Sequence, residues 1–151
     1  MNKILSYIFV FFLFILFSCS YEPILNKKNY QFSINLINAS GDKLINSIIV
    51  NRFDNLNGNK KKYDLTFTSK KEKNIISKDS KGDPTMFELL VVVNYNVKID
   101  GKIILERNIK RNNTYNNISD KFELEKYEKS IIINLSNSIS NNIVSSISQI
   151  E

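Results

Sequence analysis

The stretch TMFELLVVVNYNVKI, residues 85–99, decides the fold of this 151-residue chain. Every second side chain in it is apolar, which is the period of a β-strand with one buried face. Asp100-Gly101 follows directly, and this dipeptide is a strong signal for a tight hairpin turn. Residues 102–115 are therefore predicted to return as an antiparallel strand. The side chains predicted to share the buried face of the first strand are Phe87, Leu89, Val91, Val93, Tyr95, Val97 and Ile99.

The length of the hairpin loop sets which side chains meet across the two strands. A two-residue loop would pair Tyr95 with Glu106, an apolar side chain with a charged one. A slip of one residue turns every side chain to the other face of the sheet, so the loop length matters. We predict a three-residue loop over residues 100–102, because it keeps one continuous apolar face. Its pairs would be Ile99 with Ile103, Val97 with Leu105 and Val93 with Ile109.

A strand and an amphipathic helix are predicted ahead of this hairpin. Apolar residues alternate with polar ones from Tyr30 to Ile37, which indicates a strand. Ser40-Gly41-Asp42 then offers helix-capping chemistry. Apolar residues recur at three- and four-residue spacing from Leu44 to Phe53, the period of a helix, and the Asn55–Asn59 cluster closes it.

A further strand and a turn connect this helix to the hairpin. Tyr63, Leu65 and Phe67 alternate with polar residues and predict a half-buried strand that extends through Ile75 or Ile76. Residues 78–84, KDSKGDP, have the composition of a turn.

A long helix is predicted at the end of the chain. Ser119, Asp120 and Glu123 are typical of a helix start, with acidic groups near its positive end. A strand over residues 131–133 fits the long apolar period less well. Isoleucine and serine are weak helix formers, so packing against the sheet must stabilise this helix. Its predicted apolar face comprises Leu124, Tyr127, Ile131, Leu135, Ile139, Ile143, Ile147 and Ile150.

The order of these elements predicts the fold class. Strand, helix, three strands and helix give β-α-β-β-β-α, an α+β two-layer sandwich. We expect two helices on one face of a four-stranded, mainly antiparallel sheet. Residues 30–151 are predicted to form this as a single α+β domain, since the length allows one domain with a real core.

This topology gathers basic residues at one end of the sheet. Successive antiparallel strands alternate in direction, so the turn at 78–84 and the connection at 112–121 are expected at the same end. That end would carry Lys78, Lys81, Arg111 and Lys121, a candidate anion-binding rim. For each residue taken alone, a solvated side chain in a polar loop is an equally good explanation.

The first nineteen residues predict export and lipid attachment. A basic residue, Lys3, precedes a short apolar run, as in a secretory signal peptide over residues 1–18. The only cysteine, Cys19, follows Leu16-Phe17-Ser18, a pattern similar to the lipobox of bacterial lipoproteins. The alternatives are a transmembrane anchor, for which the run falls short of the ~20 residues needed, and an ordinary secreted protein, which has no need of a cysteine there. Residues 19–29 would form a tether.

The predicted lipid on Cys19 sets the expected localisation. Diacylglycerol on the sulfur and an acyl chain on the new amino terminus exceed the two chains that stable anchoring needs. Ser20 stands where an aspartate retains lipoproteins in the inner membrane of many Gram-negative bacteria. We therefore expect the periplasmic face of the outer membrane.

Composition excludes most catalytic and metal sites. The chain has no histidine, and lipid occupies its one cysteine, which removes nitrogen and sulfur metal ligands and the usual Ser-His and Cys-His pairs. No pair of carboxylates is spaced for acid–base catalysis. We therefore expect no enzyme activity, no catalytic residue, no metal site and no cofactor beyond the covalent lipid.

The net charge favours an anionic lipid over a nucleic acid. The formal charge is +6, falling to +5 when Lys3 leaves with the signal peptide. Lysine supplies nearly all of it, since the only arginines are Arg52, Arg107 and Arg111. Base and phosphate recognition in nucleic acids favours arginine. An anionic glycolipid or membrane surface is the expected target.

The chain resembles the lipopolysaccharide-assembly lipoprotein family, LptE, over nearly all of its mature length. The likeness lies in Cys19-Ser20-Tyr21-Glu22-Pro23, the first helix, Tyr63-Asp64-Leu65, the segment 80–97, the stretch 111–116 and the long last helix. The resemblance implies a non-enzymatic plug in the outer-membrane β-barrel translocon subunit, LptD, which inserts lipopolysaccharide into the outer leaflet. It also implies lipopolysaccharide binding through basic loop residues, of which Lys81 before Gly82 and Lys121 match by position. The longer polar C-terminal tail of some members is missing.

Two other functions remain open at this point. One is a periplasmic carrier or sensor of another amphiphile, which would need a large apolar cavity, whereas a plug needs a filled core. The other is a hydrolase, which the missing histidine disfavours.

We predict that the mature protein begins at Cys19 and carries lipid there. Intact mass spectrometry of the membrane fraction should show a diacylglyceryl-modified amino terminus and no residues 1–18. A soluble, unmodified mature chain would contradict both the anchor and the localisation.

Overall fold

The computed structural model describes residues 30, 32–54, 56 and 61–150. The signal peptide, Cys19, the tether and all of the Asn55–Asn59 cluster but Leu56 lie outside these residues. The elements are β1 (Phe32–Gly41), α2 (Lys43–Phe53), β2 (Lys61–Lys78), β3 (Pro84–Ile99), β4 (Lys102–Asn116) and α3 (Lys121–Ser148). The predicted order β-α-β-β-β-α is confirmed.

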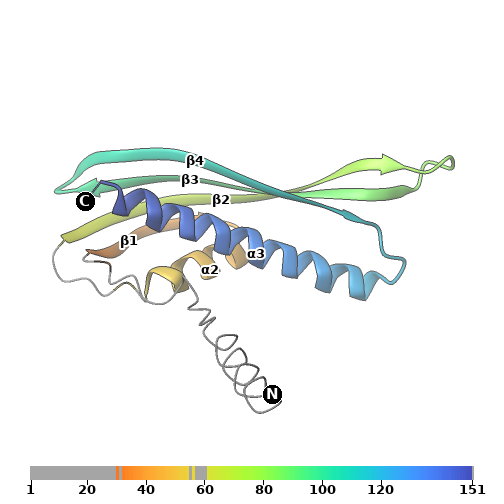
Figure 1. Cartoon of the computed structure of the whole chain (residues 1–151), viewed down its shortest axis with the longest axis horizontal. Helices are drawn as coiled ribbons and strands as arrows, with labels where there is room; N and C mark the ends of the chain where they lie inside the picture. Colours follow the sequence, from red (N-terminus) through yellow and green to blue (C-terminus); the bar gives the residue numbers. More distant parts are fainter. Residues whose placement is uncertain (1–29, 31, 55, 57–60, 151) are drawn as a thin grey trace, which may run out of the picture.

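The four strands form one mixed sheet in the order β1-β2-β3-β4. β1 pairs with β2 in parallel, and the other two pairings are antiparallel. Figure 1 shows α2 and α3 on the same side of the sheet, with the β2–β3 hairpin projecting beyond the first turn of α3. The two-layer arrangement is the predicted one.

The core lies between the sheet and the two helices. On β3 the predicted alternation holds, because Val93, Tyr95 and Val97 are buried on the face towards the helices. Leu105 and Ile109 of β4 are half-buried and pack against this core. β2 supplies Tyr63, Leu65 and Phe67, all buried, and α2 supplies Ile45, Ile49 and Phe53.

The loop of the β3–β4 hairpin differs from the prediction. Ile99 pairs with Lys102, so the loop is the two residues Asp100 and Gly101, and the predicted pair of Ile99 with Ile103 is wrong. Both loop residues have positive φ, 49° and 78°, which is the geometry of a tight hairpin turn. An irregularity after Val97 leaves one extra residue on β4. This bulge restores the predicted pairs Val97 with Leu105 and Val93 with Ile109.

The face of α3 that meets the sheet also differs in part from the prediction. Tyr127 is exposed and Ile150 lies beyond the helix, whereas Ile132 and Val144 are buried. Ser136 and Ser140 are buried as well, because their hydroxyls donate to the carbonyls of Ile132 and Asn137, at 2.7 and 2.9 Å. Small serines that satisfy their own polar groups can be buried within a helix, and an apolar pattern alone does not reveal them.

A close contact joins the end of β1 to β2. Gly41 has φ +100°, and a Cβ atom there would lie 1.9 Å from the carbonyl oxygen of Ser69. Only glycine permits this approach, since it lacks a Cβ and tolerates positive φ. The next amide, that of Asp42, donates to the hydroxyl of Ser69 at 3.0 Å. The chain thus turns from β1 into α2 directly against β2.

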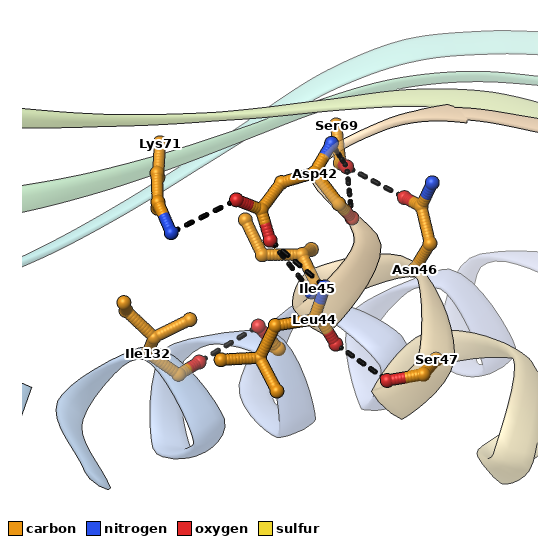
Figure 2. A network of polar contacts seen from close by, with 9 residues as sticks. Asp42, Leu44, Ile45, Asn46, Ser47, Ser69, Lys71 and Ile132 are labelled. Carbon is orange, nitrogen blue, oxygen red and sulfur yellow. Dashed lines mark hydrogen bonds and ion pairs between the residues drawn. The ribbon is translucent and has the colours of Figure 1, made fainter. Parts of the chain in front are cut away.

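Asp42 links the start of α2 to the sheet, as Figure 2 shows. Its carboxylate caps the helix by accepting from the amides of Leu44 and Ile45, at 3.0 and 3.1 Å. The same carboxylate forms an ion pair with Lys71 of β2 at 3.0 Å. The Ser69 hydroxyl donates to the side-chain oxygen of Asn46 at 2.6 Å, which adds a second bond between helix and strand.

We predict that Gly41→Ala destabilises the protein by clearly more than Gly82→Ala. Both glycines have positive φ, for which another residue costs about 1–3 kcal/mol. Only Gly41 has backbone within reach of the new Cβ, because nothing lies within 4 Å of that position at Gly82. Urea unfolding of both variants measures the difference. Equal losses would show that the contact with Ser69 does not constrain the fold.

We predict that the free energy of unfolding depends on pH through Asp42. Burial raises the pKa of its carboxyl, but the hydrogen bond and charge of Lys71 and the amides of Ile45 and Leu44 outweigh it, and the pKa lies below its usual value of 3.8. A lowered pKa in the folded state adds stability above pH 3.8 that is lost as the pH falls through the folded pKa. Asp42→Asn keeps a capping oxygen but cannot titrate. Wild type should exceed this variant in urea unfolding at pH 6, and a gap that persists well below pH 3 would contradict the assignment to Asp42.

Candidate functional site

The β2–β3 turn and the β4–α3 connection meet at one end of the sheet, as predicted. Asn117 of the connection donates its backbone amide to the carbonyl of Thr85 and its side-chain amide to that of Pro84, both at 2.8 Å. We call this region the distal end: residues 73–87, which include the turn, and residues 114–128, which include the connection and the start of α3. The β3–β4 hairpin and the start of β1 lie at the opposite end (Figure 1).

Three of the four predicted basic residues lie at the distal end with exposed side chains. Lys78 ends β2, Lys81 lies in the turn and Lys121 begins α3. In the described part of the chain none of the three forms an ion pair. Neighbouring carboxylates serve the backbone instead: Asp79 accepts from two amides of the turn, and Asp120 caps α3. The three ammonium groups are therefore available to an anion.

Arg111 does not lie at the distal end. It pairs with Val91 in the middle of β4, five residues before the strand ends at Asn116. The prediction counted residues 112–121 as the connection, although it also carried the strand on to about Tyr115. The strand does continue to Asn116, since its solvent-facing positions accept polar side chains while Tyr115 is buried against the core.

Exposed apolar side chains gather beside these lysines. In the described residues, four of the seven exposed large hydrophobic residues belong to the distal end, and Phe122 is 73% exposed. Single exposed hydrophobic residues are ordinary on a protein surface, whereas several at one end beside polar residues are typical of an interaction site. The four at this end, which the sequence pattern did not reveal, are Ile75, Ile76, Phe122 and Tyr127.

An open pocket of about 400 Å³ lies among the aromatic residues of this end. The rings of Tyr115 and Tyr127 meet edge to face with their centroids 5.9 Å apart, and Phe87 packs on Tyr115 at 5.7 Å. The pocket therefore has rigid aromatic walls on one side and amide and hydroxyl groups on the other. Its lining residues are Met86, Thr114, Tyr115, Asn116, Ile118 and Tyr127.

Glu128 connects α3 to β2 and β4 beneath this pocket. Its carboxylate accepts from the hydroxyl of Tyr115 at 2.6 Å and from the ammonium of Lys73 at 2.5 Å. Lys73 also lies over the ring of Phe87, 4.1 Å from its centroid. Burial, followed by the hydrogen bond to Glu128 and its negative charge, raises the pKa of Tyr115 well above its ordinary value. Tyr115 thus stays protonated. The charges of Glu128 and Lys73 stabilise the distal end by binding groups of the protein itself.

Other kinds of site receive no support in the described residues. No group of three or more histidine, cysteine, aspartate or glutamate side chains there could hold a metal ion. A second open pocket, of about 370 Å³, lies over β2, β3 and β4, and threonine and asparagine side chains supply most of its lining. None of the helices in the described ranges is long and apolar enough to cross a membrane.

Comparison with known proteins shows a shared fold. No family model and no curated protein matches the sequence. Rare lipoprotein B from Shewanella oneidensis has 16% identity and a TM-score of 0.60, over 76% of this chain and 95% of that one. Lipoprotein B from Nitrosomonas europaea has 12% identity and a TM-score of 0.59, over 81% and 88%.

A third solved structure agrees with these two. A minor lipoprotein from Acinetobacter baumannii has 14% identity and a TM-score of 0.54, over 80% of this chain and 92% of that one. Each match spans most of both chains. This chain therefore has a fold like that of rare lipoprotein B and similar lipoproteins.

Proposed function

We propose that this protein is a non-enzymatic outer-membrane lipoprotein, anchored through Cys19, that binds lipopolysaccharide at its distal end. In this role it is the plug and assembly subunit of the lipopolysaccharide translocon and associates with the β-barrel subunit, LptD. The observation that carries the proposal is that three lysines, which form no ion pair within the described residues, lie at the same end of the sheet as exposed apolar side chains.

This combination suits an amphiphile with phosphates and acyl chains. Lysine is a point charge that binds phosphate through charge-assisted hydrogen bonds, and Lys78, Lys81 and Lys121 would serve this purpose. Apolar area removed from water contributes about 25 cal/mol per Å², so acyl chains would gain from contact with Phe122 and Tyr127. A purely anionic ligand would leave these apolar side chains unexplained.

The length of the molecule also supports a plug. β2 has 18 residues, which corresponds to about 60 Å at ~3.3 Å per residue. A bilayer with its headgroups is about 40–45 Å thick. β1 begins at the end opposite the lysines, and Cys19 precedes Tyr30 by eleven residues. A chain anchored on the periplasmic side could therefore extend its distal end through a barrel towards the outer leaflet.

A carrier of another amphiphile is the competing function. It would need an enclosed apolar cavity between sheet and helices. Among the described residues, the side chains between the sheet and the helices form a buried apolar core. This packed core favours the plug.

We predict that Lys81→Glu with Lys121→Glu weakens lipopolysaccharide binding about tenfold or more. Charge-assisted hydrogen bonds contribute about 1.5–3 kcal/mol each, and 1.4 kcal/mol is a factor of ten. The fold, by circular dichroism, and co-purification of the barrel should not change. Binding should also weaken with salt, because exposed charges are screened over ~10 Å at 0.1 M.

The matched control is Lys98→Glu with Lys102→Glu, which reverses two charges at the opposite end. Equal losses in both double variants would assign the effect to net charge. Full binding by both would show that lipopolysaccharide contacts lie elsewhere. Affinity purification from outer membranes without a co-purifying barrel would contradict the plug itself.

A further inference from the structure

β4 is a long edge strand whose outer side is open. Among the described strands β4 pairs with β3 alone, and beyond the bulge its register from Leu105 to Asn116 has no further shift. In the described part of the chain no segment pairs with the outer side. An edge of this length is a template for another strand unless something blocks it.

The pairing pattern shows which backbone groups point outward. The amide of Asn117 donates to the carbonyl of Thr85, so the backbone N–H and C=O groups of the odd-numbered residues after the bulge point towards β3. The backbone groups of the even-numbered residues therefore point outward. The guanidinium of Arg111 donates to one of these, the carbonyl of Lys110, at 2.9 Å. The outward residues are Glu106, Asn108, Lys110, Asn112 and Thr114, all exposed.

The charges of β4 distinguish it from the other edge of the sheet. Its regular part carries Arg107, Lys110 and Arg111 against one carboxylate, Glu106. Arginine is rare in this chain, yet two of the three lie here. β1, the opposite edge, has no charged residue, and a bulge after Leu36 interrupts its ladder instead. β4 thus combines a regular ladder with a net positive charge.

A second copy of the chain fits this edge poorly. The best two-fold register centres on Asn108 and pairs Glu106 with Lys110 across the copies on the helix-free face. On the other face Arg107 of each copy lies diagonal to Arg107 and Arg111 of the other copy, with no carboxylate between them. Diagonal neighbours are within reach of long side chains, so these like charges repel. An acidic strand would meet no such repulsion.

We propose that the outer side of β4 from Leu105 to Asn116 binds an extended acidic segment of a partner protein by β-strand addition. The positions of the charges define the pattern of an antiparallel partner. Acidic residues lie opposite Arg111, Lys110 and Arg107, and a basic residue lies opposite Glu106. From the residue opposite Arg111 to the residue opposite Glu106, the sequence of the partner is therefore acidic, acidic, any, any, acidic, basic. Backbone hydrogen bonds would provide the affinity, and the charges would set the register. The inference does not depend on lipopolysaccharide binding.

The test uses the full chain in detergent and a labelled nine-residue peptide, Thr-Thr-Glu-Glu-Val-Thr-Glu-Lys-Val, with its reversed sequence for a parallel partner. Fluorescence anisotropy measures binding, and hydrogen exchange should show new protection within residues 105–116. Arg107→Glu with Lys110→Glu should weaken binding about tenfold, since each charged cross-strand pair contributes up to about 1 kcal/mol. A peptide with lysine in place of its three glutamates should bind that variant better than wild type.

Controls separate the backbone contribution from net charge. N-methylation of the peptide residues opposite Glu106, Asn108 and Lys110 should abolish binding, whereas methylation opposite Arg107, Ile109 and Arg111 should be tolerated. Lys43→Glu with Lys129→Glu, an equal reversal on the helices, should bind normally. So should Lys81→Glu with Lys121→Glu, which separates this site from the lipopolysaccharide site.

Several results would overturn the proposal. One is the absence of binding by both peptides, and another is new hydrogen-exchange protection outside β4. The proposal would also fail if the two N-methylated peptides bound equally well, or if the Arg107 and Lys110 double variant bound the peptide as tightly as wild type. A dimer in sedimentation that excludes the peptide would make a second copy the occupant instead.

Discussion

The antiparallel ladder of β2 and β3 is longer than the helix that covers it, and the arrangement of the distal end depends on this difference in length. The 18 residues of β2 extend about 60 Å, whereas the 28 residues of α3 extend about 42 Å. Near the turn the hairpin arm therefore has helical cover on neither face, and Ile75 and Ile76 are half-exposed there. Glu128 holds α3 to the arm through Tyr115 and Lys73. The candidate site exists because the sheet continues past its helical layer.

Much of the fold could be predicted because alternation and helical period are local properties. The apolar face of β3 and the capped starts of both helices followed from neighbouring residues, and Asp42 and Asp120 are the N-caps. The hairpin shows where local reasoning ends. The apolar pairing was correct, but two positive φ angles and a bulge, rather than a longer loop, produce it. The parallel pairing of β1 with β2 brings Gly41 close to Ser69, a contact between distant residues that no local pattern encodes.

The candidate site was predictable only in its charges. Lysines in polar connections are visible in a sequence, and strand alternation correctly brought Lys78, Lys81 and Lys121 to one end. The apolar half was not visible, because Tyr127 has the spacing of a core residue and is nevertheless exposed. Arg111 was misplaced since the polar run after it reads as a loop but pairs as a strand. Exposure at a helix end is a tertiary property that periodicity does not report.

The two edges of the sheet show how one architecture separates its contacts. β1 is short, uncharged and irregular after Leu36, and that bulge itself disrupts a regular ladder on the edge. β4 is longer and regular beyond its own bulge, so it keeps a continuous row of outward backbone groups with cations on both faces. The distal lysines lie beyond the end of β4, and the arginines lie along its middle. A glycolipid phosphate at the first and an acidic strand at the second would therefore occupy different surfaces, so binding at one need not exclude binding at the other.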